Sequence, residues 1–323
     1  MSDENKTADS STQQWQQDVI NRLAFAALNE QKKSRRWKIF FVLLFISYLF
    51  LVYFTTFVKP ESAGASLASK KHTALIEVKG VIADDQSASA DNIVTGLRNA
   101  FKNEKVQGVI LRINSPGGSP VQAGYINDEI ARLREQYPDT KIYAVITDIG
   151  ASGGYYIAAA ADEIYADKAS LVGSIGVIMN SFGFTEAIEK LGVERRLYTA
   201  GENKGFLDPF SPERKEEVQH IKGMLDNIHQ QFIETVKQGR GDRLVDNSEI
   251  FSGLIWTGEK SLELGLVDGL GSSSYVAREI IQAENIVDYT PRPDFFERFT
   301  RQFGAAMGQA ISNTLGLEKG TLR

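Results

Sequence analysis

The sequence predicts an α/β domain that follows a single membrane-spanning helix near the N-terminus. From about residue 73 onward, short apolar runs typical of buried strands alternate with helical patterns. Residues 39–58 are predominantly apolar and hold no charged side chain. The chain has 323 residues, of which 42% are hydrophobic, so it can also build a sizeable core.

The composition excludes several classes of chemistry. The chain has no Cys, which rules out disulfides, thiolate metal sites and a cysteine nucleophile. Its three histidines leave few members for a histidine-based centre; they are His72, His220 and His229. The formal net charge of −5 gives no indication of a nucleic-acid partner. We therefore expect no metal, no cofactor and no nucleic acid.

The uncharged stretch at residues 39–58 has the length of a bilayer span. At about 1.5 Å per residue, this helix covers roughly 30 Å. A signal-peptide core is shorter and lies closer to the N-terminus. Basic residues cluster just before the stretch and are sparser after it, which predicts a cytoplasmic N-terminus. The expected layout is a cytoplasmic segment (1–36), a transmembrane helix (37–58), a linker (59–72) and a domain outside the cytoplasm (73–288).

The first half of that domain predicts strands joined by helices. Strand patterns cover residues 74–82, 106–113 and 141–147, and helix patterns cover residues 91–103 and 121–137. A glycine-rich turn then leads into a short apolar helix at 155–161. In such an α/β domain the ends of the strands carry the functional site.

The second half continues the alternation. Strand patterns cover 163–166, 172–178 and 193–199, and helix patterns cover 185–191 and 212–238. The last of these helices has apolar residues at intervals of three and four, which predicts a packing face. The tail, residues 289–323, contains a similar stripe within residues 295–315. We expect an amphipathic helix there that docks on the domain or on a neighbouring subunit.

Ser152 is the first candidate site residue, because it lies where a strand ends and a helix begins. Gly150 permits a tight turn, and small residues surround the serine. Such a turn lifts a hydroxyl to the mouth of the sheet and points the next backbone N–H at a developing oxyanion. A phosphate loop or a plain close-packed turn is the alternative, although the spacing of the known phosphate motifs is absent.

Two further segments bear on the same chemistry. The segment 114–120, NSPGGSP, follows another strand, and its glycines could open a backbone N–H into a pocket or simply form a turn. The histidines fall in the linker or within the long helix, so lysine is the remaining general base. A lysine serves as a base only when its surroundings keep it neutral. Lys204 lies in a glycine-flanked loop, as a site residue often does. The alternative is that it is an ordinary lysine exposed to solvent.

Five motifs together resemble one protein family. They are NSPGG at 114–118, the block at 150–162, GSIGV at 173–177, the block at 201–210 and WTGEKSLELGLVDGLG at 256–271. Their order over residues 73–284 is similar to that of the signal peptide peptidase A family of serine proteases. The resemblance implies a fold of the Clp/crotonase superfamily, a spiral of ββα units, and a serine endopeptidase with a Ser–Lys dyad.

The resemblance also implies roles for single residues. Ser152 matches the nucleophile and Lys204 the general base. Gly118 and Gly153 match the oxyanion donors, and Ser174 matches a hydroxyl that orients the lysine. This chain resembles the short, single-domain form of the family. The resemblance further implies a homo-oligomeric ring at the outer face of the bacterial inner membrane that acts on signal peptides and other short or unfolded peptides.

Some features depart from the family, and other functions remain open. Asn203 and Gly205 flank Lys204 where the family more often has Tyr and Asp.

The same dyad could serve membrane-protein quality control or the processing of one partner. In a different class, the domain could be a catalytically silent membrane scaffold with a crotonase-like fold. An acyl-CoA enzyme is disfavoured, because the membrane span places the domain away from CoA.

Overall fold

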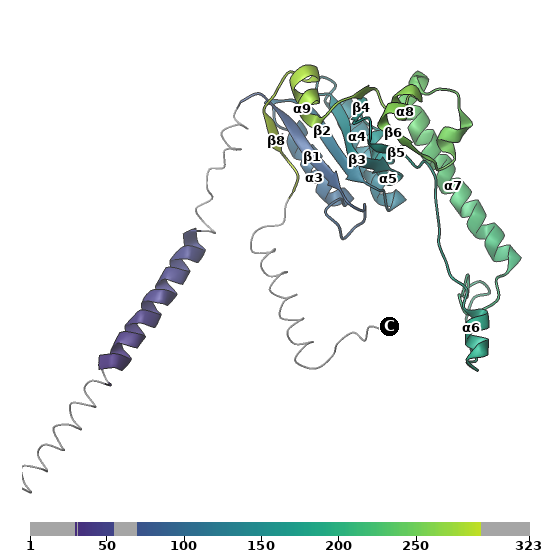
Figure 1. Cartoon of the computed structure of the whole chain (residues 1–323), viewed down its shortest axis with the longest axis horizontal. Coiled ribbons are helices and arrows are strands. Elements are labelled where there is room, and N and C mark those ends of the chain that lie inside the picture. Colours follow the sequence, from purple (N-terminus) through teal and green to yellow (C-terminus); the bar gives the residue numbers. More distant parts are fainter. Residues whose placement is uncertain (1–29, 31, 55–69, 292–323) are drawn as a thin grey trace, which may run out of the picture. The chain divides into compact units, whose positions relative to one another are not determined.

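The computed structural model describes residues 30, 32–54 and 70–291, and the chain divides into two units at residues 63/64 (Figure 1). In the first unit, the helix Lys32–Phe54 is the one described helix that is long and apolar enough to cross a membrane. Its most apolar window has a mean hydropathy of 2.1. It covers the predicted span as far as Phe54. The segment 1–29, residues 55–69 and the expected helix at 295–315 lie outside the described residues.

The second unit is built on an eight-stranded sheet of order β6-β5-β3-β2-β1-β8, with β4 paired to β3 and β7 paired to β4. Neighbouring strands run parallel, except that β5 and β6 are antiparallel. The strands are β1 (His72–Lys79), β2 (Val106–Ser115), β3 (Ile142–Ala151), β4 (Glu163–Ala166), β5 (Leu171–Gly173), β6 (Ile255–Thr257), β7 (Gly269–Leu270) and β8 (Ile286–Asp288). The predicted α/β alternation is confirmed.

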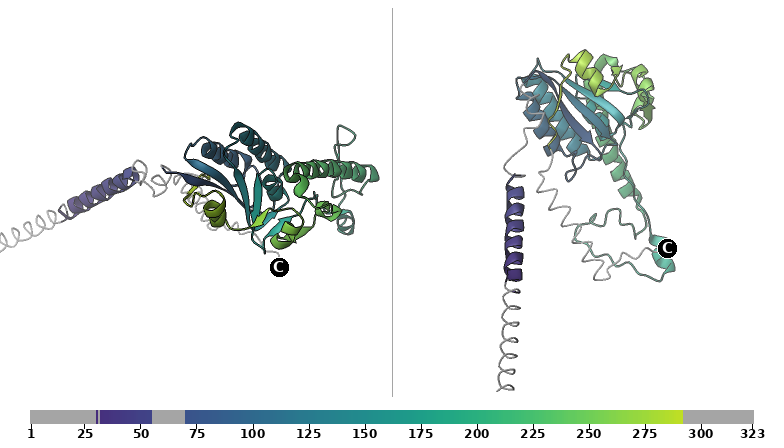
Figure 2. Two further views of the ribbon diagram at one scale, coloured as in Figure 1. Left: turned by 90° about the horizontal axis from the view of Figure 1, so that it is seen from above. Right: turned by 60° about the vertical axis from the view of Figure 1, so that its left-hand side comes forward.

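Helices cover both faces of this sheet (Figures 1 and 2). On one face, α3 (Ala90–Phe101), α4 (Pro120–Gln136) and α5 (Gly153–Ala158) bury apolar stripes in the main core. The other face carries a smaller cluster against α9 (Ser273–Tyr275) and the following π-turn. The start of α4 is set by Ser119, whose hydroxyl accepts a hydrogen bond from the Gln122 backbone N–H. The central strands are therefore buried on both sides, as their apolar runs predict.

Two strand predictions are wrong. Of the predicted strand 172–178 only the beginning pairs, as part of β5, and residues 193–199 form no strand in the described structure. Residues 176–214, which we name the α6 arm, instead lead to α6 (Thr185–Lys190), at the far end of α7 (Lys215–Arg240) from the sheet. A segment with an alternating pattern forms a strand only when a neighbouring strand takes up its backbone hydrogen bonds. No such strand lies beside this segment in the described chain.

Glu129 links α3 to α4 through two arginines. Its buried carboxylate accepts hydrogen bonds from Arg132 at 2.6 Å and Arg98 at 2.7 Å. These bonds, that of Arg132 first, lower the pKa of Glu129 to about 2. The stabilisation is therefore fully present above the ordinary pKa of 4.5 and is lost as the pH falls toward about 2.

We expect Glu129→Gln to destabilise the fold by about 1–3 kcal/mol near neutral pH, because the two arginines lose their ionised partner. The difference from wild type should shrink as the pH is lowered from 4.5 toward 2, since the wild-type carboxylate then becomes protonated as well. Urea denaturation at several pH values measures this. Glu135→Gln, an exposed change on the same helix, is the control. A difference that stays constant with pH would contradict the assignment.

Candidate active site

Ser152 lies at the end of β3 in a strained conformation. Its backbone has φ 51° and ψ −124°, a region that costs a non-glycine residue about 1–3 kcal/mol. Two backbone hydrogen bonds hold it there: Ser152 N–H donates to the Gly173 carbonyl at 2.8 Å, and Tyr156 N–H donates to the Ser152 carbonyl at 2.9 Å. A Cβ on Gly154 would lie 2.9 Å from the Ser115 carbonyl oxygen, so the small residues around Ser152 are needed for the turn.

The loop after β2 lies directly against this turn, because Ser115 of β2 pairs with Gly150 of β3. Gly118 has φ 153°, and a Cβ there would lie 2.1 Å from the Ile82 carbonyl oxygen, so the sharp approach requires glycine. An isolated β-bridge joins Ile82 to Gly118. In it, Ile82 N–H donates to the Gly117 carbonyl, and Ser119 N–H donates to the Ile82 carbonyl. The N–H of Gly118 therefore stays outside this bridge.

Gly153 supplies a second backbone N–H beside Ser152. It is the first residue of α5, and an N–H in the first turn of a helix has no acceptor within that helix. An ideal Cβ on Gly153 would lie 3.3 Å from the Gly118 nitrogen, which shows how closely the two glycines approach. The structure thus brings together three predicted site residues, Ser152, Gly118 and Gly153.

A cavity of about 160 Å³ opens beside Ser152. We name it the Ser152 pocket. Four segments line it: the start of α4, the turn at Ser152, the extended segment after β5 and the middle of α7. The lining residues are Gly118, Pro120, Ala123, Ser152, Gly153, Tyr156, Gly176, Val177, Ile178, Ile228, Gln231 and Phe232. The pocket is large enough for one apolar side chain of a bound peptide.

Ser174 lies one residue after the acceptor of the Ser152 N–H. It also has a positive φ, 51°, and its N–H donates to the Leu254 carbonyl at 2.7 Å. Its half-buried hydroxyl has no hydrogen-bond partner among the described residues, and the same is true of the Ser152 hydroxyl. Both hydroxyls are therefore available for a further group.

Lys204 lies elsewhere, in the α6 arm, and its side chain is exposed. Its loop docks on the first turns of α7: the Phe206 ring contacts His220, and Leu207 N–H donates to Glu217 at 3.3 Å. The Ser152 pocket contacts α7 only from Ile228 onward. At about 1.5 Å per residue, the two contact points on α7 lie on the order of 12–16 Å apart. No hydrogen bond joins Lys204 to Ser152 in the described chain.

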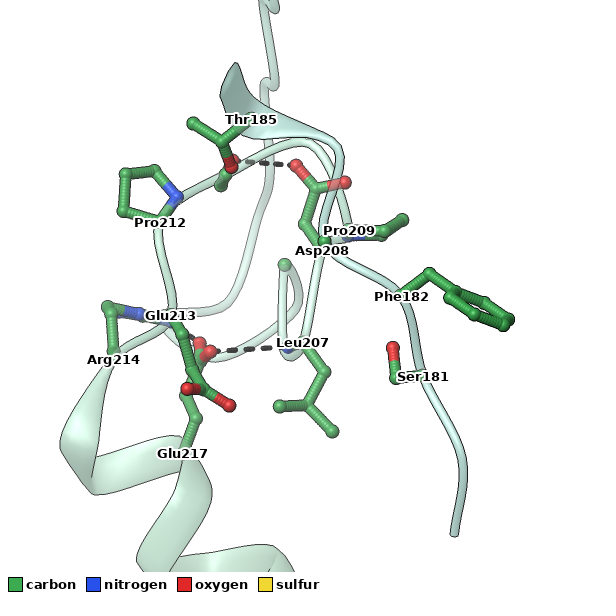
Figure 3. A pocket seen from close by; sticks show the side chains of 13 residues that line it. Ser181, Phe182, Thr185, Leu207, Asp208, Pro209, Pro212, Glu213, Arg214 and Glu217 are labelled. Carbon is green, nitrogen blue, oxygen red and sulfur yellow. Dashed lines mark hydrogen bonds and ion pairs between the residues drawn. The ribbon is translucent and has the colours of Figure 1, made fainter. Parts of the chain in front are cut away.

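The conformation of the Lys204 loop is well defined. Figure 3 shows a pocket lined by the following residues Gly205 and Leu207, where Glu217 of α7 points toward Leu207. Glu217 is 6% exposed and also pairs with Arg214. Asp208 accepts hydrogen bonds from Ser211 and Arg195, which lower the pKa of its carboxyl. These contacts tie the residues that follow Lys204 to the start of α7.

Comparison with known proteins identifies the family. Residues 134–287 match the family model described as Peptidase family S49. A putative signal peptide peptidase SppA from Enterococcus faecium is 30% identical over 263 residues, which cover 79% of this chain and 75% of that relative. The chain belongs to peptidase family S49. The resemblance to signal peptide peptidase A and the Clp/crotonase-like α/β fold are confirmed.

Other curated proteins extend the comparison. Protease 4 of Haemophilus influenzae is 30% identical over 246 residues, 75% of this chain and 40% of that protein. A protein of Brucella melitensis named Na(+)/H(+) antiporter NhaA is 50% identical over 175 residues, which are 54% of this chain. This chain thus spans about a quarter, 24%, of that antiporter's length. Membership of S49 supports a serine-type peptidase.

Sequence reasoning missed the contribution of α7 to the Ser152 pocket. Ile228 and Phe232 belong to the apolar stripe that the sequence assigns to packing, and Tyr156 belongs to the helix after Ser152. The stripe was the available signal. It shows that one face of the helix is covered, but the periodicity does not reveal which part of the chain covers it.

Proposed function

We propose that the protein is a membrane-anchored serine endopeptidase that degrades cleaved signal peptides and other short or unfolded peptides at the outer face of the bacterial inner membrane. The observation that carries the proposal is the strained Ser152 turn beside two backbone N–H groups. This arrangement fits acyl transfer through an oxyanion. S49 membership supports the same reaction class.

The catalytic roles follow from the chemistry of these groups. A neutral Lys204 amine takes the proton of the Ser152 hydroxyl as Oγ attacks the carbonyl carbon of the substrate. The N–H groups of Gly118 and Gly153 donate to the oxyanion of the tetrahedral intermediate. The Lys204 ammonium then gives its proton to the leaving amine, and water hydrolyses the acyl-enzyme. Ser174 donates or accepts a hydrogen bond that orients the lysine.

We propose that Lys204 acts on the Ser152 of a neighbouring copy. Within one chain the Ser152 pocket and the Lys204 loop contact α7 at separate places. Neither the Ser152 hydroxyl nor the Lys204 side-chain amine has a hydrogen-bond partner among the described residues. The α6 arm also exposes large apolar side chains, among them Phe182 at 76% and Tyr198 at 89%. Exposed apolar patches of this kind mark contacts between proteins. Head-to-tail contacts between copies would cover the arms and close into a ring.

Anchoring and substrate choice follow from features outside the catalytic residues. The helix Lys32–Phe54 has the length and hydropathy of a membrane span, and basic residues lie at its N-terminal end. The Ser152 pocket admits one side chain at a time, so it favours an extended peptide over a folded protein. A cleaved signal peptide has an apolar core and is too short to fold into a domain, so it meets both conditions.

The proposed function is tested with purified full-length protein in lipid vesicles and a synthetic signal peptide. We expect mass spectrometry to show cleavage within the apolar part of the peptide by wild type and none by Ser152→Ala. A fluorophosphonate should label wild type and spare the variant. Cleavage that persists in Ser152→Ala, or a wild type that cleaves nothing, would overturn the proposal. The physiological substrate is identified by comparing the peptides that accumulate in cells carrying Ser152→Ala with those in wild-type cells. Accumulated signal peptides support the proposal, whereas accumulated fragments of membrane proteins favour quality control.

A further inference from the structure

His229 joins two walls of the Ser152 pocket. It lies on α7 between Ile228 and Gln231, which line the pocket. Its Nε2 lies 3.1 Å from the carbonyl oxygen of Ile175. A carbonyl can only accept a hydrogen bond, so Nε2 carries the proton in this contact. The imidazole is half-buried and takes no part in the proposed proton transfers.

The segment that receives this hydrogen bond is anchored at its start, since Ser174 N–H donates to the Leu254 carbonyl and the Ile175 side chain is fully buried. Its strand pairing ends with Gly173, and Gly176, Val177 and Ile178 continue as extended chain that lines the pocket. On the side away from α7 the segment packs closely, since a Cβ on Gly176 would lie 3.1 Å from the Gly253 Cα. The bond from His229 therefore ties the segment to the α7 wall.

A second set of contacts, separate from that of His229, fixes α7 against α5. Thr235 Oγ1 lies 2.9 Å from the Tyr156 hydroxyl oxygen, and the rings of Tyr156 and Phe232 pack with their centroids 5.1 Å apart. These contacts hold α7 against α5, the helix that begins next to Ser152. With α7 fixed there, the contact of His229 sets the separation between α7 and residues 176–178.

We propose that His229 is a positioning residue that determines specificity: it sets the width of the Ser152 pocket and thereby which substrate side chain is accepted. This inference rests on the proposed peptidase function. The cavity of about 160 Å³ accepts a single aliphatic side chain, and its lining is mostly apolar. Without the bond from His229, Val177 and Ile178, which lie beyond the buried Ile175, lose their tie to α7 and the pocket admits larger side chains.

The test uses full-length protein and a peptide series that differs only in the residue that enters the pocket: Ala, Leu or Phe. We expect wild type to prefer Leu over Phe. His229→Phe keeps a ring but removes the donor, and it should reduce that preference about tenfold, a range typical for small changes in an apolar pocket. The change should appear as faster cleavage of the Phe peptide together with a higher KM for the Leu peptide.

Matched variants separate positioning from folding. His229→Gln supplies a side-chain N–H of similar reach and should retain the wild-type preference. His229→Leu removes the donor with a smaller side chain and should shift the preference in the same direction as His229→Phe, so it decides the question if the Phe variant does not fold. Gln230→Phe, an exposed neighbour on α7, should leave the preference unchanged.

The possible failures are distinguishable. An unchanged preference in both donor-free variants, or a uniform slowing of all three peptides, would overturn the role of His229 while leaving the peptidase function intact. A wild-type protein that cleaves none of the peptides would overturn the proposed function itself, and the role of His229 with it.

Discussion

Two inactive variants, Ser152→Ala and Lys204→Ala, are expected to regain peptidase activity when they assemble together. Each change alone should lower kcat by about 10⁴-fold or more, because the nucleophile and its base act as one unit. In a mixed ring with head-to-tail contacts, about a quarter of the sites combine an intact Ser152 with an intact Lys204 from the next copy. Co-expression with two different tags, sequential purification and a peptide-cleavage assay measure the recovery.

The matched control replaces one partner with the double variant Ser152→Ala/Lys204→Ala. Mixed with Lys204→Ala, it supplies no intact lysine, so activity should stay absent. Lys204→Arg should be inactive as well, because a guanidinium cannot give up its proton near neutral pH. Mixed complexes that form but show no recovery would place the dyad within one chain and overturn the arrangement between copies.

Asp268→Ala is expected to cost about 3–5 kcal/mol of stability, because it leaves the buried charge of Arg240 without a partner. The Arg240 side chain is 1% exposed, and its guanidinium binds both oxygens of Asp268, at 2.6 and 2.9 Å. Asp268 also accepts the Ile164 N–H at 2.7 Å, which connects α7 to β4. Urea denaturation of the variant and of wild type measures the loss.

Two further variants test the cause of this effect. Asp242→Ala removes an exposed carboxylate near the end of α7 and should change stability little. Replacing the pair together, as Arg240→Met/Asp268→Leu, should recover most of the loss, because the fully buried charge of Arg240 is removed and the remaining cation, Arg243, is partly exposed. A cost below about 1 kcal/mol for Asp268→Ala would contradict a buried, structural ion pair.

The Asp268 carboxyl also gives this effect a pH dependence. Burial alone would raise its pKa, but the hydrogen bonds from Arg240 and from Ile164 N–H, with the nearby positive charges, lower the pKa overall. The contribution of the pair is therefore present above the ordinary pKa of 3.8 and declines as the pH falls below it. Asp268→Ala should accordingly lose less stability at acidic pH than at neutral pH.

The sheet and the Ser152 turn could be predicted because local physics determines them. Buried parallel strands need continuous apolar runs, and β1, β2 and β3 have them. A serine at the end of a strand, with backbone packed on both sides, needs small neighbours, and Gly150, Gly153 and Gly154 provide them. These requirements act within a few residues, so they are visible in the sequence.

The position of Lys204 and the walls of the Ser152 pocket could not be predicted in the same way. Residues 193–199 have a strand-like pattern, but a strand forms only beside a partner, and none lies next to them in the described chain. The contact between Tyr156 and Phe232 joins residues far apart in the sequence. Helical periodicity indicates that one face of a helix is covered, but it does not reveal which segment of the chain covers that face.

The docking of Lys204 at the far end of α7 has a consequence for when the protein is active. If the dyad forms between copies, as we propose, a newly made molecule on its own holds a nucleophile without the amine that activates it and is harmless to the proteins around it. Proteolysis would then begin only where molecules meet, and its onset should rise steeply with their surface density. Assembly would thus do the work that a removable propeptide does in other proteases.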